Sequence, residues 1–185
     1  MITPRTLNTL EQAFRHALQE TWAGISAIDS RTLPETDLPG ERRLLALTLS
    51  SYTFRIIVLF EFCIDADMKA FLAALFRNKE RNFTERALAD ALSEYVNMVC
   101  GNANRLLASE SLHTGMSTPF VLETTCKKHI QKIGPDQTLV FRVNAEDAVQ
   151  FELVLCVCAA KGTTLDLALK PRAVEETFSG ELELF

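Results

Sequence analysis

The sequence predicts an α+β domain of two layers, in which helices pack on one antiparallel sheet. Three observations support this fold class. Apolar residues recur at steps of three and four in several segments, which is typical of amphipathic helices. Other segments are short runs rich in Leu, Ile, Val and Phe that end at turn residues, which is typical of strands. The 185 residues are 48% hydrophobic, which is enough for one well-packed core. We expect a single domain over residues 1–170, followed by an acidic, mobile tail over 171–185.

The first half of the chain predicts one helix, a β-hairpin and then two more helices. Apolar residues from Leu7 to Ile25 fall on one helical stripe. Residues 29–40 carry two prolines and a glycine and are expected to form a loop. The runs 42–50 and 53–63 are expected to pair as a hairpin, the second strand being central because it is apolar on both faces. Asp65 or Asp67 is expected to cap a helix that ends at Arg77, and Thr84 to start a long helix after a polar break at 78–81.

The second half predicts a group of antiparallel strands. The long helix is expected to end near residue 108, and residues 109–115 to form a loop. Strands are expected over 117–124, 138–143 and 148–159, with turns at 134–136 and 144–147. Residues 163–169 are expected to add a short edge strand. The predicted order is therefore helix, hairpin, helix, helix and meander.

The charge and the apolar pattern exclude several classes of protein. The net charge is −5 and the isoelectric point is about 5.3. Broad binding of nucleic acid or of anionic membranes needs a positive field, so neither is expected. Residues 1–15 have no apolar stretch of the kind found in secretory signals, and no window has the roughly twenty apolar residues of a membrane span. We expect a cytoplasmic protein.

The cysteines and histidines do not form a metal-binding pattern. The five cysteines include no CxxC spacing and are an odd number, so we expect reduced, mostly buried thiols. The three histidines are far apart in the sequence, and none has a second ligand at metal spacing. No metal is assigned to this chain.

The long helix is the informative segment, because its polar residues fall in one line. Asp90, Glu94, Asn97 and Gly101 step by four, three and four residues, which places them on one side of a helix. That side faces solvent or a partner. A polar outer face alone is common in amphipathic helices, but a glycine inside a helix costs about 1 kcal/mol relative to alanine, so Gly101 hints at a close approach. The core side is expected to hold Leu88, Leu92, Tyr95, Val99, Ala103 and Leu106.

These residues resemble the signature of the CheC/CheX/FliY chemotaxis phosphatases. The match consists of Asp90-xxx-Glu94-xx-Asn97, then Gly101-Asn102, and Pro119 at the start of the next strand. The element order is also similar to that family over roughly residues 5–160. The family fold is therefore expected for most of the chain.

The sequence departs from the family pattern at three places. Pro119 lies one residue nearer to Asn97 than is usual, and Tyr52-Thr53-Phe54 stands where the first hairpin often has a glycine. The first helix offers His16-xxx-Glu20-xx-Ala23, which lacks the asparagine of a second site. The chain therefore resembles the one-site CheX arrangement more than the two-site CheC arrangement.

The resemblance implies hydrolysis of the aspartyl phosphate of a CheY-like response regulator. Asn97 is then expected to position the attacking water, and Glu94 to pair with a lysine of the regulator. Asp90 either supports docking or is solvated surface, and Gly101, Asn102 and Pro119 are expected to contact the partner. Mg²⁺ is expected in the regulator, not in this chain.

Two other functions fit the same residues. The first is a non-catalytic module of the same fold that binds a response regulator or a flagellar-switch protein. The second is an interaction protein that dimerises by strand addition at an uncovered sheet edge, for which the strands 138–143 and 148–159 are the candidates. CheX-type relatives form homodimers through their sheets, so a homodimer is expected as well.

Overall fold

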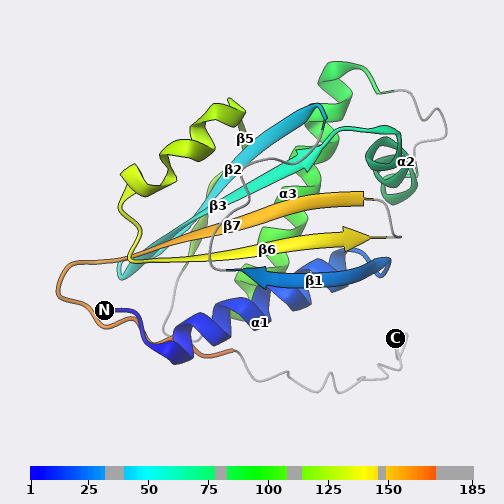
Figure 1. Cartoon of the computed structure of the whole chain (residues 1–185). Coiled ribbons are helices and arrows are strands. Elements are labelled where there is room, and N and C mark those ends of the chain that lie inside the picture. Colours follow the sequence, from blue (N-terminus) through cyan, green and yellow to red (C-terminus); the bar gives the residue numbers. More distant parts are fainter. Residues whose placement is uncertain (32–39, 78–82, 108–113, 146–148, 170–185) are drawn as a thin grey trace, which may run out of the picture.

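The computed structural model describes residues 1–31, 40–77, 83–107, 114–145 and 149–169. Within these residues the order is α1 (Pro4–Thr21), β1 (Ile25–Arg31), β2 (Arg42–Ser50), β3 (Phe54–Cys63), α2 (Ala66–Leu75), α3 (Glu85–Leu107), β4 (Gly115–Met116), β5 (Phe120–Leu122), the 3₁₀ helix η1 (Thr124–Ile133), β6 (Gln137–Ala145) and β7 (Val149–Ala159). The predicted α+β class is confirmed (Figure 1).

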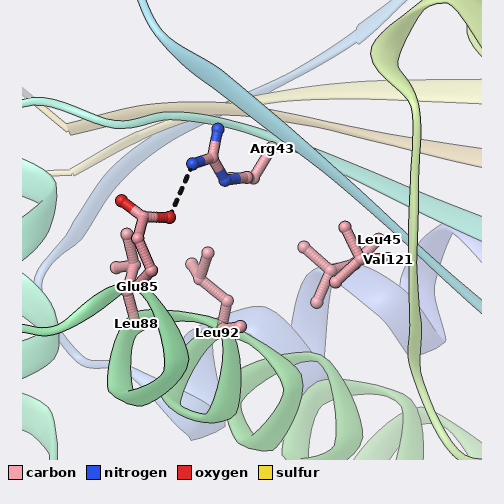
Figure 2. A pocket seen from close by; sticks show the side chains of 7 residues that line it. Arg43, Leu45, Glu85, Leu88, Leu92 and Val121 are labelled. Atoms are coloured by element: carbon pink, nitrogen blue, oxygen red, sulfur yellow. Dashed lines mark hydrogen bonds and ion pairs between the residues drawn. The ribbon is translucent and has the colours of Figure 1, made fainter.

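One antiparallel sheet forms the centre of the described structure. Its strand order is β1-β6-β7-β3-β2, and both β4 and β5 pair with the far side of β2. Figure 2 shows Val121 of β5 beside Leu45 of β2, its antiparallel partner. The predicted hairpin is confirmed by the pairing of β2 with β3. The central position predicted for its second strand is confirmed as well, because β3 lies between β2 and β7.

The main core lies between the sheet and the three α-helices. Alternate residues of β2, namely Leu45, Leu47 and Leu49, face the helices and are buried. Tyr95 of α3 is fully buried within an aromatic cluster. Its ring lies edge-on to those of Phe60, Phe62, Phe71 and Phe151. These contacts fix α3 against β3 and β7, so the opposite side of α3 is left for solvent or a partner.

The other face of the sheet is partly covered by η1, which the sequence did not predict. Ile130 of η1 packs on a smaller apolar cluster that includes Leu44 and Ala46. Lys127 of η1 forms ion pairs with two buried carboxylates, Glu61 and Glu152, which are cross-strand partners on β3 and β7. Burial raises the pKa of the Glu152 carboxyl, and the nearby Lys127 ammonium reduces this rise without cancelling it.

The ends of several predicted elements are corrected. The first helix ends at Thr21, and residues 25–31 form the strand β1, which overlaps the loop predicted over 29–40. β1 was missed because only part of it is apolar. It is fixed by Arg15 of α1, whose guanidinium donates to the Ile28 carbonyl at 2.6 Å and to Ser30 Oγ at 2.6 Å. The strand predicted over 117–124 is divided into β4 and β5.

The helix starts are confirmed. Asp65 caps α2 by accepting from the Met68 backbone N–H at 2.8 Å, and Thr84 accepts from the Ala87 N–H at 3.2 Å before α3. The polar break at 78–81 and the tail 171–185 lie outside the described residues, as does the greater part of the 29–40 and 109–115 loops.

The strands that were predicted to form an open edge are interior. β6 lies between β1 and β7, and β7 lies between β6 and β3. Both sides of each strand are already paired, so neither accepts a further strand. At its two sides the described sheet ends in β1 and in β4 with β5.

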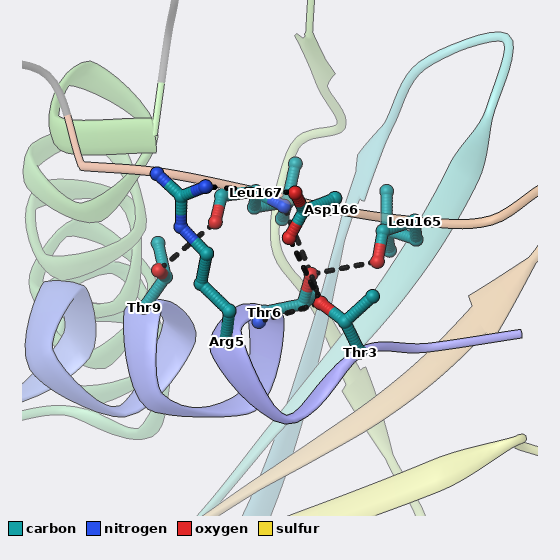
Figure 3. Close-up of polar contacts among 7 residues, drawn as sticks. All are labelled: Thr3, Arg5, Thr6, Thr9, Leu165, Asp166 and Leu167. Atoms are coloured by element: carbon teal, nitrogen blue, oxygen red, sulfur yellow. Dashed lines mark hydrogen bonds and ion pairs between the residues drawn. The ribbon is translucent and has the colours of Figure 1, made fainter.

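Residues 163–169 do not extend the sheet as an edge strand. They run along the first turns of α1, where three threonines hold them (Figure 3). Thr6 Oγ1 donates to the Leu165 carbonyl at 2.8 Å and accepts from the Leu167 N–H at 2.8 Å. Thr9 Oγ1 donates to the Leu167 carbonyl at 3.1 Å, and the Thr3 N–H to the Leu165 carbonyl at 3.2 Å. We call this arrangement the terminal clasp.

Three of the five cysteines are buried thiols, as expected: Cys63, Cys100 and Cys156. Cys158 is half-buried and Cys126 is exposed. No disulfide joins any of the five.

Candidate functional site on helix α3

Helix α3 carries the predicted site on the side that points away from the sheet. Its buried residues are Leu88, Leu92, Tyr95, Val96, Val99, Cys100, Ala103 and Leu107. The predicted core side is therefore confirmed, except that Leu106 is only partly buried. The buried arc is also wider than predicted, since Val96 and Cys100 belong to it.

The four polar positions of the predicted line lie outside this buried arc. Asp90 and Glu94 are exposed, whereas Asn97 and Gly101 are half-buried. Within the described residues the side chains of Glu94 and Asn97 make no hydrogen bond or ion pair. Asp90 lies 4.0 Å from Arg86, and both side chains are largely exposed, so this ion pair contributes little to stability.

Gly101 faces open space. A Cβ added to it would meet no atom of the described residues within 4 Å, leaving aside the backbone of its own helix. The fold therefore does not need a glycine here for packing, and the φ angle of Gly101 is not in the left-handed region. A glycine inside a helix lowers stability relative to alanine, and packing within the described fold gives no reason for it. A reason outside the chain is the close approach of another molecule to this position.

Asn102 lies on a different flank of the helix. Its Nδ2 donates to Thr21 Oγ1 of α1 at 3.1 Å, and its Oδ1 accepts from Arg105 Nη2 at 2.6 Å. At about 100° per residue, Asn102 is about 140° around the helix from Asn97. The Asn102 amide therefore joins α1 to α3.

Pro119 lies at the edge of the sheet beside β2. It lies two residues after Ser117, whose backbone N–H donates to the Thr48 carbonyl at 2.9 Å. It directly precedes β5. Pro119 is half-buried. It therefore belongs to the short segment, β4 to β5, that lines the edge of the sheet next to α3.

A small groove separates this segment from α3, and sequence reasoning missed it. It is lined by Arg43, Leu45, Glu85, Leu88, Ala89, Leu92 and Val121. Figure 2 shows the Arg43 guanidinium meeting Glu85 at one end, where Nη2 and Oε2 are 2.8 Å apart. The hydrogen bond that Arg43 donates to Glu85 raises the pKa of the Arg43 guanidinium. The only sequence signal was the apolar triplet Phe120–Leu122, which was assigned wholly to the sheet.

The corresponding positions near α1 are not all on the helix. His16 and Glu20 lie on α1, but the helix ends at Thr21, so Ala23 lies beyond it. Glu20 instead lies 4.0 Å from Arg105 of α3. The residues described by the structure include no group of three or more His, Cys, Asp or Glu placed to hold a metal ion. They also include no helix long and apolar enough to cross a membrane.

Comparison with known proteins places this arrangement in a known fold. No protein-family model matches the sequence, and no curated protein sequence is significantly similar to it. Solved structures do match. CheX from Vibrio vulnificus has a TM-score of 0.59 at 15% identity, over 80% of this chain and 98% of that one. A chain of the CheX–CheY–BeF₃–Mg²⁺ complex from Borrelia burgdorferi has a TM-score of 0.58 at 13% identity, over 82% and 97%.

A CheC-like superfamily protein from Shewanella sp. PV-4 gives a third match, with a TM-score of 0.56 at 13% identity, over 84% of this chain and 98% of that one. Each match spans nearly the whole of the known chain. The resemblance predicted from the residues of the long helix is therefore confirmed at the level of the fold. This chain has the α+β fold of the CheX and CheC-like chemotaxis proteins.

Proposed function

We propose that this chain is a CheX-like phosphatase that hydrolyses the aspartyl phosphate of a CheY-like response regulator. The observation that carries the proposal is the outer face of α3. There Glu94 and Asn97 lie one turn apart with no partner within the described residues, and Gly101 follows in open space. One of the structures with the same fold is a complex of CheX with CheY, BeF₃ and Mg²⁺. We therefore assign a CheY-like regulator as the partner of this chain and the outer face of α3 as its docking surface.

Asn97 is assigned to the attacking water. An amide side chain is uncharged at neutral pH and has both a donor and an acceptor. Its Oδ1 would accept a hydrogen bond from the water and hold the water oxygen in line with phosphorus. The new bond joins that oxygen to phosphorus, while the bond from phosphorus to the aspartyl oxygen breaks. The products are the regulator's aspartate and inorganic phosphate. The phosphate keeps the hydroxyl of the attacking water, and another of its oxygens takes up the water's second proton.

Glu94 is assigned to docking. A carboxylate close to the attacked phosphoryl group would be repelled by it, whereas a carboxylate one turn away is well placed to meet a lysine of the regulator. Such a charge-assisted hydrogen bond contributes about 1.5–3 kcal/mol once it is removed from water. Asp90 lies one further turn along the same face, where it supports the same charge complementarity. The Mg²⁺ that neutralises the phosphate is assigned to the regulator.

Two variants separate these roles. Asn97→Ala should lose most of the hydrolysis rate at saturating regulator while its dissociation constant changes little. Glu94→Ala should chiefly raise the dissociation constant. The measurement is release of inorganic phosphate from a CheY-like regulator phosphorylated with acetyl phosphate, with binding measured separately by calorimetry. If both variants hydrolyse as fast as the wild-type chain at every concentration, the proposed site is wrong.

The alternative is a non-catalytic module of the same fold that binds a response regulator. Binding alone does not require an amide at residue 97, so the presence of Asn97 favours the enzyme. If the wild-type chain binds regulators without accelerating phosphate release, the alternative is the correct function. The homodimer also stays a prediction.

A further inference from the structure

The edge strand β5 presents two exposed apolar side chains on opposite faces of the sheet. Val121 is 51% exposed and Phe120 is 48% exposed. Val121 is paired with Leu45, which faces the helices, whereas Phe120 is paired with Ala46, which belongs to the opposite face. Val121 therefore lines the groove next to α3, and Phe120 does not.

The groove itself is small and apolar inside. Its cavity volume is about 60 Å³, far below the roughly 300 Å³ at which cofactor and drug sites begin. Leu45, Leu88 and Leu92 are buried beneath it, and Ala89 of α3 and Val121 of β5 also line it. This space suits the end of one aliphatic side chain.

The exposed charges on this part of α3 are predominantly acidic. Glu85 is 79% exposed and Asp90 is 76% exposed, and Glu94 lies one turn further along the helix. Arg43 is held by Glu41 and Glu85, each at 2.8 Å. Arg86 is the basic side chain that α3 adds here, and it lies near Asp90. The groove therefore fits an aliphatic side chain that is flanked by lysine or arginine.

We propose that the α3–β5 groove receives an aliphatic side chain of the response regulator and thereby helps to select which regulator is bound. This inference rests on the proposed function, because the regulator is the same partner. Ala89 lies about 12 Å along the helix from Asn97, at about 1.5 Å per residue. Ala89 also lies about 80° around the helix from Asn97, on the side away from Glu94. A regulator that holds its phosphate over Asn97 therefore covers the groove where its surface extends past Asn97 toward β5.

The neighbouring residues of β5 offer a matched test. Val121→Ser removes the apolar side of the groove, and Phe120→Ser makes the same change on the other face at nearly equal exposure. Ala89→Leu fills the groove from the helix without weakening helix propensity. Each variant is first compared with the wild-type chain by circular dichroism and thermal unfolding. Ala89→Leu keeps the test valid if a β5 variant proves unstable.

The readouts are the KM and kcat of phosphate release from CheY-like regulators loaded with acetyl phosphate and Mg²⁺. Val121→Ser and Ala89→Leu should each raise KM by about tenfold, the change expected for one lost aliphatic contact. For both, kcat should stay within about twofold of wild type. Phe120→Ser should match wild type in both constants.

Different results would contradict the docking role of the groove and the phosphatase function itself. If the wild-type chain is active and all three variants keep its KM, the groove is not part of the docking surface and the inference is overturned. If Val121→Ser and Phe120→Ser weaken binding equally, the groove is again excluded. If no regulator is bound or dephosphorylated by the wild-type chain, the proposed function and this inference fail together.

Discussion

Replacing Gly101 by alanine should make the fold more stable and the protein less active. Position 101 is inside α3, where alanine is favoured over glycine by about 1 kcal/mol. Within the part of the chain that the structure describes, the added methyl group meets no atom within 4 Å outside its own helix backbone, so no packing cost there opposes this gain. For a chain of 185 residues, about 1 kcal/mol corresponds to a rise of roughly 2–4 °C in Tm.

The expected loss of activity has a different origin. Gly101 lies one turn beyond Asn97 on the face assigned to the regulator, so the methyl group would separate the two surfaces. A misplacement of about 1 Å in a reacting pair can reduce the rate by roughly a hundredfold. We therefore expect catalytic efficiency to fall by at least about tenfold. Urea unfolding measures the first effect, and phosphate release from a phosphorylated regulator measures the second.

Gly162 provides the control. A Cβ added there also meets no described atom within 4 Å, but Gly162 has a φ of +76°. Gly162→Ala should therefore destabilise the fold by about 1–2 kcal/mol, with catalysis unchanged in the folded protein. Unchanged activity in Gly101→Ala, together with higher stability, would refute the assignment of this face to a partner. Lower stability would refute the account of the helix itself.

Three further predictions concern stability. Tyr95→Phe should stabilise the protein by about 1–2 kcal/mol in urea unfolding, because the buried Tyr95 hydroxyl has no hydrogen-bond partner in the described structure; a loss of stability would show that the hydroxyl is satisfied. Thr6→Val should destabilise by about 2 kcal/mol, because the Leu167 N–H of the terminal clasp loses its acceptor (Figure 3); an unchanged unfolding midpoint would contradict this. Burial raises the pKa of Glu152 above the ordinary 4.5, so the folded chain binds its proton more tightly than the unfolded chain. The contribution of Glu152 to the free energy of unfolding therefore falls as pH rises above about 4.5. The stability of Glu152→Gln relative to wild type should rise as the pH increases above about 4.5, and a constant difference would refute the raised pKa.

Elements with strong local signals were predictable from the sequence. The starts of α2 and α3 follow from Asp65 and Thr84, whose side chains accept backbone hydrogen bonds within their own first turn. The apolar strands β2, β3, β6 and β7 were identified because they are long and rich in branched residues. Their order in the sheet was not predictable, since it depends on pairings between segments far apart in the chain.

The missed elements depend on long-range contacts. β1 pairs with β6, which lies far along the chain, and it is also held by Arg15 of the preceding helix. η1 is attached through Lys127 and Ile130, whose partners lie on β2, β3, β6 and β7. A lysine paired with two buried carboxylates reads in sequence as an ordinary surface residue, so its role becomes visible only in three dimensions.

In the candidate site too, some features follow from local sequence and others depend on long-range contacts. The positions of Glu94, Asn97 and Gly101 on one outer face of α3 follow from helical spacing alone. The hydrogen bond from Asn102 to Thr21 of α1 does not, because it joins residues 81 positions apart. The groove was also hidden, since Val121 looks like any other strand residue until its partner strand is known.

Hydrolysis by way of Asn97 is tested most directly by the rate of phosphate release from a phosphorylated CheY-like regulator at saturating enzyme, with wild type compared with Asn97→Ala. Asn97→Asp serves as an isosteric third protein, because its carboxylate keeps the shape but adds a charge beside the phosphate. The role proposed for Asn97 predicts that wild type accelerates phosphate release and that both variants lose about a hundredfold or more of this acceleration. Equal rates for wild type and Asn97→Ala would contradict it.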